Sequence, residues 1–340
     1  MTVASLLTPP PELPQPWRQT PLVESATLSR MAGCRIFLKL DNLQPSGSFK
    51  SRGIGNLVRQ SISSYPPDTP LHFYASSGGN AGLACVTAAS ALYGYPSTVV
   101  VPVSTSPEMV KNIVQAGAGA ATVIVQGKTI AEADNWLRET LLPQDPYGIY
   151  VPPFDHPDIW KGASSVAHEL VDQLLGVPPD AIVCSVGGGG LLIGICQGLE
   201  ECGVTVGCQT RVVGVETQGA ESFAEALRAG HVITLPGIKS IATSLGCVRV
   251  AQKALQVAER GNVTSVVVTD RQAVDACLRF ADDERILVEP ACGATLAMIY
   301  SGKLREVMGV TEQSIVVLEV CGGSNVSLQL LDKWKVEYGL

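Results

Sequence analysis

Lys50 is the residue of this sequence best placed for chemistry. A strand-like alternation at residues 36–40 is broken by Pro45, Ser46 and Gly47, and apolar residues at helical spacing follow Lys50. This pattern predicts that Lys50 lies at the N-terminus of a helix, where the macrodipole disfavours a cation and favours a neutral amine or an imine. Such a lysine could form a Schiff base, because only the unprotonated amine attacks a carbonyl. A solvated lysine in a polar turn is the alternative.

A second candidate site is a run of small residues after the predicted strand at residues 71–75. It reads Ser76-Ser77-Gly78-Gly79-Asn80-Ala81-Gly82, and an alanine-rich helical pattern continues to Leu92. Small side chains let backbone N–H groups approach an anion closely, and a helix N-terminus favours a carboxylate or a phosphate. The sequence therefore predicts an anion-binding turn, with an ordinary tight turn and a polar cap as the alternative.

Four consecutive glycines, Gly187 to Gly190, follow the predicted strand at residues 181–186 and precede a helical pattern. Such a run costs backbone entropy that a simple connection does not need. No register places glycine at i, i+2 and i+5, as a dinucleotide-binding turn requires, and the Gly-Lys-Ser/Thr ending of a P-loop is absent. We favour close approach of the backbone to a phosphate as the interpretation.

Cys321 stands at the end of the strongly apolar run at residues 315–320 and begins the turn Cys321-Gly322-Gly323-Ser324-Asn325. It could touch a bound cofactor, although a buried structural cysteine is the commoner case. A Schiff-base lysine, an anion turn and a phosphate-sized glycine loop together indicate pyridoxal phosphate. This cofactor needs an imine, a phosphate cradle and a partner for its pyridine nitrogen.

Strand and helix patterns alternate along almost the whole sequence, which predicts βα units, parallel sheets and helices on both sheet faces. Ligands bind such sheets at the carboxyl ends of the strands, where the three turns are expected to lie. Proline-containing seams near residues 42–45 and 151–157 predict a large domain of residues 1–43 and 156–340, with a small domain of residues 44–155 inserted in it. The predicted strands span residues 36–40, 71–75, 98–102, 121–125, 181–186, 211–216, 265–269 and 314–320.

The composition of the 340 residues suits buried parallel strands, since 16% are charged and the mean hydropathy is +0.24. The net charge of −7 comes without basic clusters, and no apolar run could cross a bilayer, so we expect neither nucleic acid nor a membrane as a partner. Ten cysteines without a C-x-x-C pair predict reduced thiols and no zinc site. The proline-rich N-terminal arm, residues 1–14, lacks signal-peptide features, which predicts a cytoplasmic protein.

Five segments carry a resemblance to a known family. They lie in the family's order between residues 43 and 327 and read P-S-G-S-F-K-S-R-G-I-G, S-S-G-G-N-A-G, S-V-G-G-G-G-L-L, V-E-P-A-C-G-A and V-C-G-G-S-N. The sequence resembles the fold-type II pyridoxal-phosphate enzymes, and among them the catabolic L-serine dehydratases (serine ammonia-lyases). The resemblance implies an α/β fold of the tryptophan synthase β type, with two parallel-type open twisted sheets and flanking helices.

The resemblance also assigns roles to individual positions. It implies that Lys50 holds the cofactor as a Schiff base, that Phe49 stacks on the ring, and that Asn80 bonds the ring hydroxyl. It places Cys321 opposite the pyridine nitrogen, and Ser244 beneath the ring, where mammalian relatives have alanine. The other implied sites are a phosphate cradle (Gly187, Gly188, Gly189, Gly190, Leu191), a substrate-carboxylate turn (Ser77, Gly78, Gly79, Asn80, Ala81) and a monovalent-cation site, K⁺ being the expected ion (Gly187, Glu216, Ala220, Leu245, Cys247).

The activity that the resemblance implies is β-elimination from L-serine, giving pyruvate and ammonia, and from L-threonine, giving 2-oxobutanoate. Lys50, once displaced by the substrate, would remove the α-proton. The family is commonly dimeric, so a homodimer is expected.

Three alternatives stay open at this point: a serine racemase, another fold-type II enzyme such as a biosynthetic threonine deaminase, and a non-catalytic amino-acid-binding homologue. Racemases and biosynthetic deaminases typically read S-x-G-N-H in the carboxylate turn, whereas Ala81 follows Asn80 here. The chain also ends about 13 residues after Ser327, so we expect no regulatory domain of the deaminase kind. An intact lysine and glycine loop argue against a non-catalytic homologue.

Overall fold

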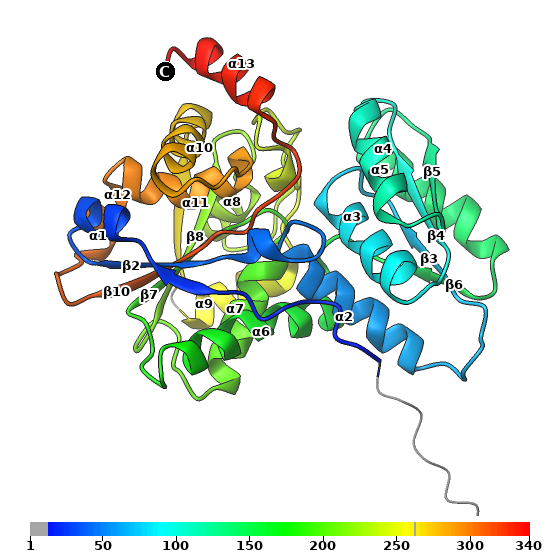
Figure 1. Ribbon diagram of the computed structural model, residues 1–340, viewed down its shortest axis with the longest axis horizontal. Helices are drawn as coiled ribbons and strands as arrows, with labels where there is room; N and C mark the ends of the chain where they lie inside the picture. The colour runs from blue at the N-terminus through cyan, green and yellow to red at the C-terminus, as the bar shows by residue number, and fades with distance from the viewer. Residues whose placement is uncertain (1–12, 262) are drawn as a thin grey trace, which may run out of the picture.

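The computed structural model describes residues 13–261 and 263–340, which form two open sheets with helices on both faces (Figure 1). The larger sheet has the strand order β1-β2-β10-β7-β8-β9, and the smaller sheet has the order β5-β4-β3-β6. Neighbouring strands are parallel except β1 and β2. The strands are β1 Leu22–Glu24, β2 Arg35–Lys39, β3 His72–Ala75, β4 Ser97–Val101, β5 Ala121–Val125, β6 Gly148–Tyr150, β7 Ala181–Ser185, β8 Arg211–Thr217, β9 Thr264–Val268 and β10 Ile315–Glu319.

Helices separate almost all of the parallel strands. They are α1 Ala26–Ala32, α2 Lys50–Ser63, α3 Asn80–Val86, α4 Pro107–Ala116, α5 Ile130–Trp136, α6 Pro157–Gln173, α7 Gly190–Glu201, α8 Ser222–Ala229, α9 Gln252–Gly261, α10 Asp270–Glu284, α11 Pro290–Tyr300, α12 Lys303–Met308 and α13 Leu328–Tyr338. Short 3₁₀ turns occur at Asp41–Leu43, Leu142–Gln144 and Thr243–Leu245, and π-helical turns extend α3 over Thr87–Leu92 and α5 over Leu137–Leu141. Most of the predicted N-terminal arm lies outside the described residues.

The larger sheet is buried on both faces, which explains why its strands are almost continuously apolar. In β7 the residues from Ala181 to Cys184 are all fully buried. Helices α1, α10, α11, α12 and α13 contribute to the core on one face, and α6, α7, α8 and α9 to the core on the other. The predicted α/β fold with two parallel-type sheets is confirmed. Strands β1 and β6 were not predicted, because three residues are too few to display a period.

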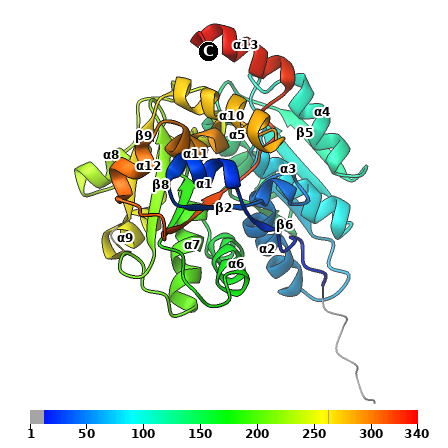
Figure 2. The ribbon, with the colours of Figure 1, turned by 60° about the vertical axis from the view of Figure 1, so that its left-hand side comes forward.

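The smaller sheet uses only strands between residues 72 and 150, and α6 then leads the chain back to the larger sheet. Helices α2, α3 and α4 pack on one of its faces and α5 packs on the other. Helix α2 also lies along α6, where Gly162 allows close approach to the backbone of Arg52 (Figures 1 and 2). The expected domain boundaries at residues 44 and 155 stay a prediction, since α2 contacts both parts of the molecule.

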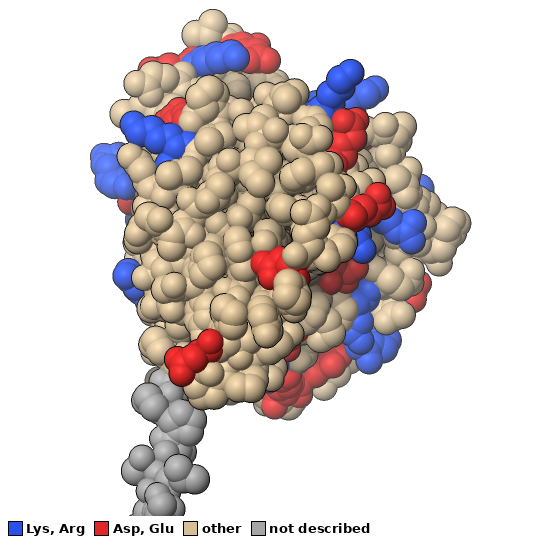
Figure 3. Space-filling view, turned by 90° about the vertical axis from the view of Figure 1, so that its right-hand side faces the viewer, with Lys and Arg blue, Asp and Glu red and all other residues tan. Residues whose placement is uncertain are grey.

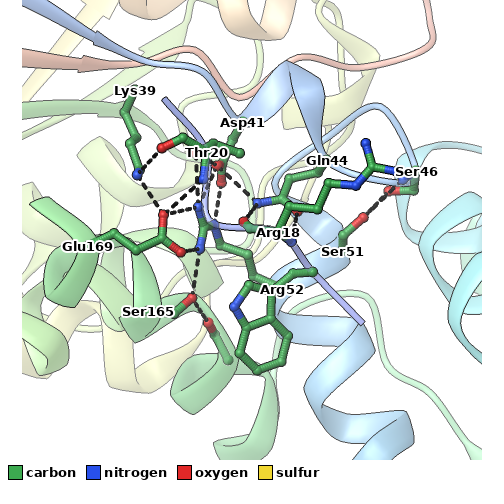
Figure 4. A network of polar contacts seen from close by, with 12 residues as sticks. Arg18, Thr20, Lys39, Asp41, Gln44, Ser46, Ser51, Arg52, Ser165 and Glu169 are labelled. Atoms are coloured by element: carbon green, nitrogen blue, oxygen red, sulfur yellow. Dashed lines mark hydrogen bonds and ion pairs between the residues drawn. The ribbon is translucent and has the colours of Figure 1, made fainter. Parts of the chain in front are cut away.

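A buried group of charges, which we call the ionic cluster, fixes the first turn of α2 (Figure 4). It consists of Lys39, Asp41, Arg52 and Glu169, and the Lys39, Asp41 and Arg52 side chains are fully buried. The Arg52 guanidinium donates to Asp41 at 2.6 and 2.7 Å and to Glu169 at 2.5 and 2.9 Å. Lys39 donates to the same glutamate at 2.6 Å. Because Arg52 follows Lys50 by two residues, the cluster holds the helix start on which Lys50 stands.

The surface on the side of the smaller sheet carries few charges over most of its area, with Lys and Arg scattered near its margins (Figure 3). This distribution agrees with the low charged fraction of the sequence. Within residues 13–261 and 263–340, no helix combines the length and the apolarity that a membrane span requires.

Candidate active site

Lys50 is the first residue of α2, and its side chain lines a small cavity together with Phe49, Phe154 and Leu191. Its Nζ donates to the Pro153 carbonyl oxygen at 2.5 Å and lies 5.2 Å from the centre of the Phe49 ring. Burial lowers the pKa of Lys50, and nearby acidic groups oppose this shift only in part. These groups are Cys247, Cys321 and Glu289. A lysine in this environment gives up its proton readily, as Schiff-base chemistry requires.

The glycine loop connects β7 to α7 and packs against two other segments of the chain. A side chain at Gly188 would overlap the Phe154 ring, and one at Gly187 would come within 3.2 Å of the Leu245 backbone. Gly189 has a φ of +91°, which a side chain would strain. In the described part of the chain, the N–H groups of Gly187 to Gly190 donate no hydrogen bond. Four unused donors at a helix N-terminus form a cradle that suits a phosphate.

The predicted carboxylate turn leads from β3 into α3. The Ser77 hydroxyl accepts from the Gly79 N–H at 3.3 Å, and a side chain at Gly82 would overlap the Ser77 carbonyl. Among the described residues, the N–H groups of Ser77, Gly78, Asn80 and Ala81 donate no hydrogen bond. The turn therefore presents several free backbone donors, which is the property that an anion-binding turn needs.

Asn80 belongs to a second polar group, the active-site polar cluster, in which Asn80 and Glu289 are buried and Ser244 and Asn325 are half-buried. Its Nδ2 donates to Glu289 at 2.9 Å and to the Ser244 hydroxyl at 3.2 Å, and its Oδ1 accepts from the Ser324 N–H at 2.9 Å. Both amide hydrogens of Asn80 are thus in use. To donate to a ring hydroxyl, as predicted, Asn80 has to give up one of these two bonds.

Glu289 is the functional candidate to which the sequence assigned no role. It is 2% exposed and immediately precedes Pro290 at the start of α11, and its carboxylate also accepts from the Asn325 N–H at 2.9 Å. Burial raises the pKa of Glu289, while hydrogen bonds from Ser244, Asn325 and Asn80 oppose the shift. The sequence feature that could have indicated a role for Glu289 is that it is an acid inside the otherwise apolar segment V-E-P-A-C-G-A. Its contact with Asn80 orients the Asn80 amide.

Cys321 is buried at the end of β10, with its Sγ 3.4 Å from the Ser185 hydroxyl, and its carbonyl accepts from the Phe49 N–H at 3.1 Å. Contact with Cys292 and burial raise the pKa of Cys321 well above the usual value. The thiol therefore stays protonated. The fold brings Cys321, Phe49 and Lys50 together, as the resemblance implies.

The predicted cation residues come from three segments: Gly187 from the glycine loop, Glu216 and Ala220 from the end of β8 and the loop after it, and Leu245 and Cys247 from the turn at residues 243–247. Glu216 is fully buried and accepts from the N–H groups of Phe223 and Ala224, both at 2.8 Å; burial raises the pKa of Glu216 to about 8. Burial likewise raises the pKa of Cys247 to about 11. The Leu245 carbonyl accepts from the Cys247 N–H at 2.7 Å. Gly187 packs against Leu245, and Ala220 belongs to the same hydrophobic cluster as Leu245.

No group of three or more His, Cys, Asp or Glu side chains arranged to hold a metal ion is present in the described part of the chain. A K⁺ site made largely of backbone carbonyls would not show such a group, so the cation prediction stays open.

Comparison with known proteins gives the family. The family model described as pyridoxal-phosphate dependent enzyme matches residues 13–322. A protein of Mus musculus named serine dehydratase-like is 46% identical over 326 residues, covering 95% of each chain. An L-serine dehydratase/L-threonine deaminase of Bos taurus is 45% identical, covering 95% of this chain and 96% of its own. The crystal structure of a fungal L-serine ammonia-lyase from Rhizomucor miehei matches with a TM-score of 0.88 at 35% identity, covering 95% of this chain and 99% of the other.

The chain belongs to the family of pyridoxal-phosphate-dependent enzymes. The predicted family and fold are confirmed, and the unused N–H groups of the glycine loop fit the phosphate of the cofactor that the family implies. The roles of individual residues stay predictions.

Proposed function

We propose that this chain eliminates water from L-serine to give pyruvate and ammonia, and acts on L-threonine to give 2-oxobutanoate. Relatives named for these activities support the proposal over 95% of the chain. The observation that carries it is the position of Lys50, whose pKa is lowered by burial at the start of α2, beside the glycine loop. When bound, pyridoxal phosphate supplies an electron sink for charge that develops at the α-carbon.

The residues of this chain then have distinct tasks. The N–H groups of residues 187–190 hold the phosphate, and those of residues 77–81 bind the substrate carboxylate. Lys50, freed from the cofactor, takes the α-proton, and the Pro153 carbonyl is placed to hold the resulting ammonium. Phe49 and Ser244 would contact the two faces of the cofactor ring, and the neutral Cys321 thiol would be the partner of its pyridine nitrogen. Because a thiol is a weak donor, it would leave this nitrogen largely unprotonated.

Elimination is favoured over racemisation because a racemase needs a second acid/base on the opposite face of the substrate. The position after Asn80, which is histidine in typical racemases, is Ala81 here. Incubation of the loaded protein with L-serine should release pyruvate faster than D-serine, and the reverse order of rates would contradict the proposal. A screen of 2-oxoacid release across the common amino acids would rank serine against threonine and would expose a non-catalytic homologue.

Three finer features belong to the same proposal. A K⁺ ion is held near the glycine loop by Gly187, Glu216, Ala220, Leu245 and Cys247; the chain forms a homodimer; and it acts in the cytoplasm. Activity in K⁺ compared with tetramethylammonium buffers tests the ion. Sedimentation equilibrium of the loaded protein tests the dimer, and fluorescence microscopy of a tagged chain tests the location.

A further inference from the structure

The substrate-carboxylate turn is anchored at both of its ends. At its far end Asn80 bonds the loops of the larger sheet. At its near end the Ser76 hydroxyl donates to Asp134 Oδ1 at 2.5 Å. Ser76 is 3% exposed and separates the end of β3 from the turn. The second anchor therefore fixes the direction in which the chain leaves the sheet.

Asp134, on α5, is itself held in one position. The Tyr150 hydroxyl on β6 donates to the same Oδ1 at 2.6 Å, and Arg138 lies 3.8 Å from Oδ2 and over the Tyr150 ring. Burial, and then the bond to Asp134, raise the pKa of Tyr150, so the phenol remains a donor. The Ser76 and Tyr150 hydroxyls and the Arg138 guanidinium offset the negative charge of Asp134. Without them, this charge would repel an anion bound to the adjacent turn.

We propose that Asp134 is a positioning residue for the substrate-carboxylate turn, acting through Ser76. This inference rests on the proposed function of the turn, and Asp134 itself touches no substrate. Loss of the acceptor releases the Ser76 hydroxyl and lets the free N–H groups of the turn leave the orientation that binds a carboxylate. Amino-acid affinity then falls, while the reaction at Lys50 keeps its rate once the substrate is bound.

The smaller sheet offers a matched control. Tyr74, on the strand next to β6, donates to Asp145 at 2.8 Å, which is also a tyrosine–aspartate pair. Within the described part of the chain, no hydrogen bond joins the Tyr74 or Asp145 side chain to the substrate-carboxylate turn. Asp145→Ala and Asp134→Ala should therefore destabilise the fold by similar mechanisms, and only Asp134→Ala should weaken amino-acid binding.

The test titrates the cofactor-loaded protein with L-alanine, which has the substrate carboxylate but no hydroxyl to eliminate, and follows cofactor absorbance. Asp134→Ala and Ser76→Ala should each weaken alanine binding roughly tenfold. Asp134→Asn, whose oxygen still accepts, should return to within about threefold of the parent, and Asp145→Ala should stay within about twofold. With L-serine, the KM should rise in parallel while kcat changes less than about twofold.

Equal alanine affinity in Asp134→Ala and the parent would overturn the inference, as would equal weakening by Asp145→Ala. If Asp134→Ala fails to fold, Ser76→Ala carries the same test. A parent that binds alanine but releases no pyruvate from serine would contradict the proposed function and leave the binding comparison interpretable.

Discussion

The two polar clusters contain buried carboxylates whose pKa values shift in opposite directions. In the ionic cluster, burial alone would raise the pKa of Asp41, but the Arg52 guanidinium together with hydrogen bonds from Thr20 and Gln44 outweighs burial, and the pKa is lowered. In the active-site polar cluster, burial raises the pKa of Glu289, and neutral donors offset the shift only in part. The partner, rather than the depth of burial, decides whether a buried acid is fixed as an anion. The ionic cluster is suited to hold structure, and the active-site cluster to adjust to a ligand.

The largest effect is expected from Arg52→Ala in the ionic cluster. The change leaves Asp41 and Glu169 without the guanidinium that both of them bind, so the free energy of unfolding should fall by about 3–5 kcal/mol. Urea denaturation measures this loss. Lys161→Ala breaks an exposed pair with Glu201 and should cost less than about 1 kcal/mol. Equal losses in the two variants would show that the ionic cluster does not hold the fold.

Glu289→Gln tests the active-site cluster. Glutamine has one acceptor oxygen, so either the Asn80 amide or the Asn325 N–H must face another donor. An unsatisfied buried donor costs about 1–3 kcal/mol, which predicts a fall of roughly tenfold or more in kcat or in cofactor affinity. Steady-state kinetics and fluorescence titration with pyridoxal phosphate measure both. The exposed Glu312→Gln is the control, and a Glu289 variant that behaves like it would remove Glu289 from the site.

Cys321 should tolerate a neutral replacement better than a charged one. Cys321→Ser keeps a weak donor and should retain kcat within about tenfold, or about 1.4 kcal/mol of barrier. Cys321→Asp would protonate the pyridine nitrogen and place a further acid near Glu289, so elimination should be slower than in the serine variant. Comparison of kcat for the two variants is the measurement. If the aspartate variant matched the parent, the thiol would not face the ring nitrogen.

The pH dependence of stability tests the environment of Glu216. The pKa of Glu216 is raised to about 8 by burial, against an ordinary value of 4.5. The folded state therefore binds the Glu216 proton more tightly than the unfolded state does. The stabilisation of the folded state by this neutral carboxyl group is fully present below about pH 4.5 and is lost as the pH rises through 8. Thermal unfolding between pH 5 and 9 should show a decline that Glu216→Gln reduces. K⁺ should restore stability at pH 9 in the parent and not in Glu216→Gln; an equal response would separate Glu216 from the cation site.

Local patterns were enough to predict the strands other than β1 and β6, the fold class and the start of α2 at Lys50, because period, glycine and proline act within a few residues. Contacts between distant segments could not be predicted in this way. The bond from Asn80 to Glu289 spans 209 residues, and Arg52 meets Glu169 across 117. The sequence therefore indicated Asn80 as a site residue but gave no sign that both of its amide hydrogens are already in use.

The central claim is that Lys50 carries the cofactor. The most direct test is reduction of the loaded protein with borohydride, proteolysis, and mass spectrometry of the peptides. We expect the pyridoxyl group on Lys50, and no label in a Lys50→Ala variant that keeps its urea midpoint. A label on Lys39, on Lys161 or on any other lysine of the parent would contradict the claim.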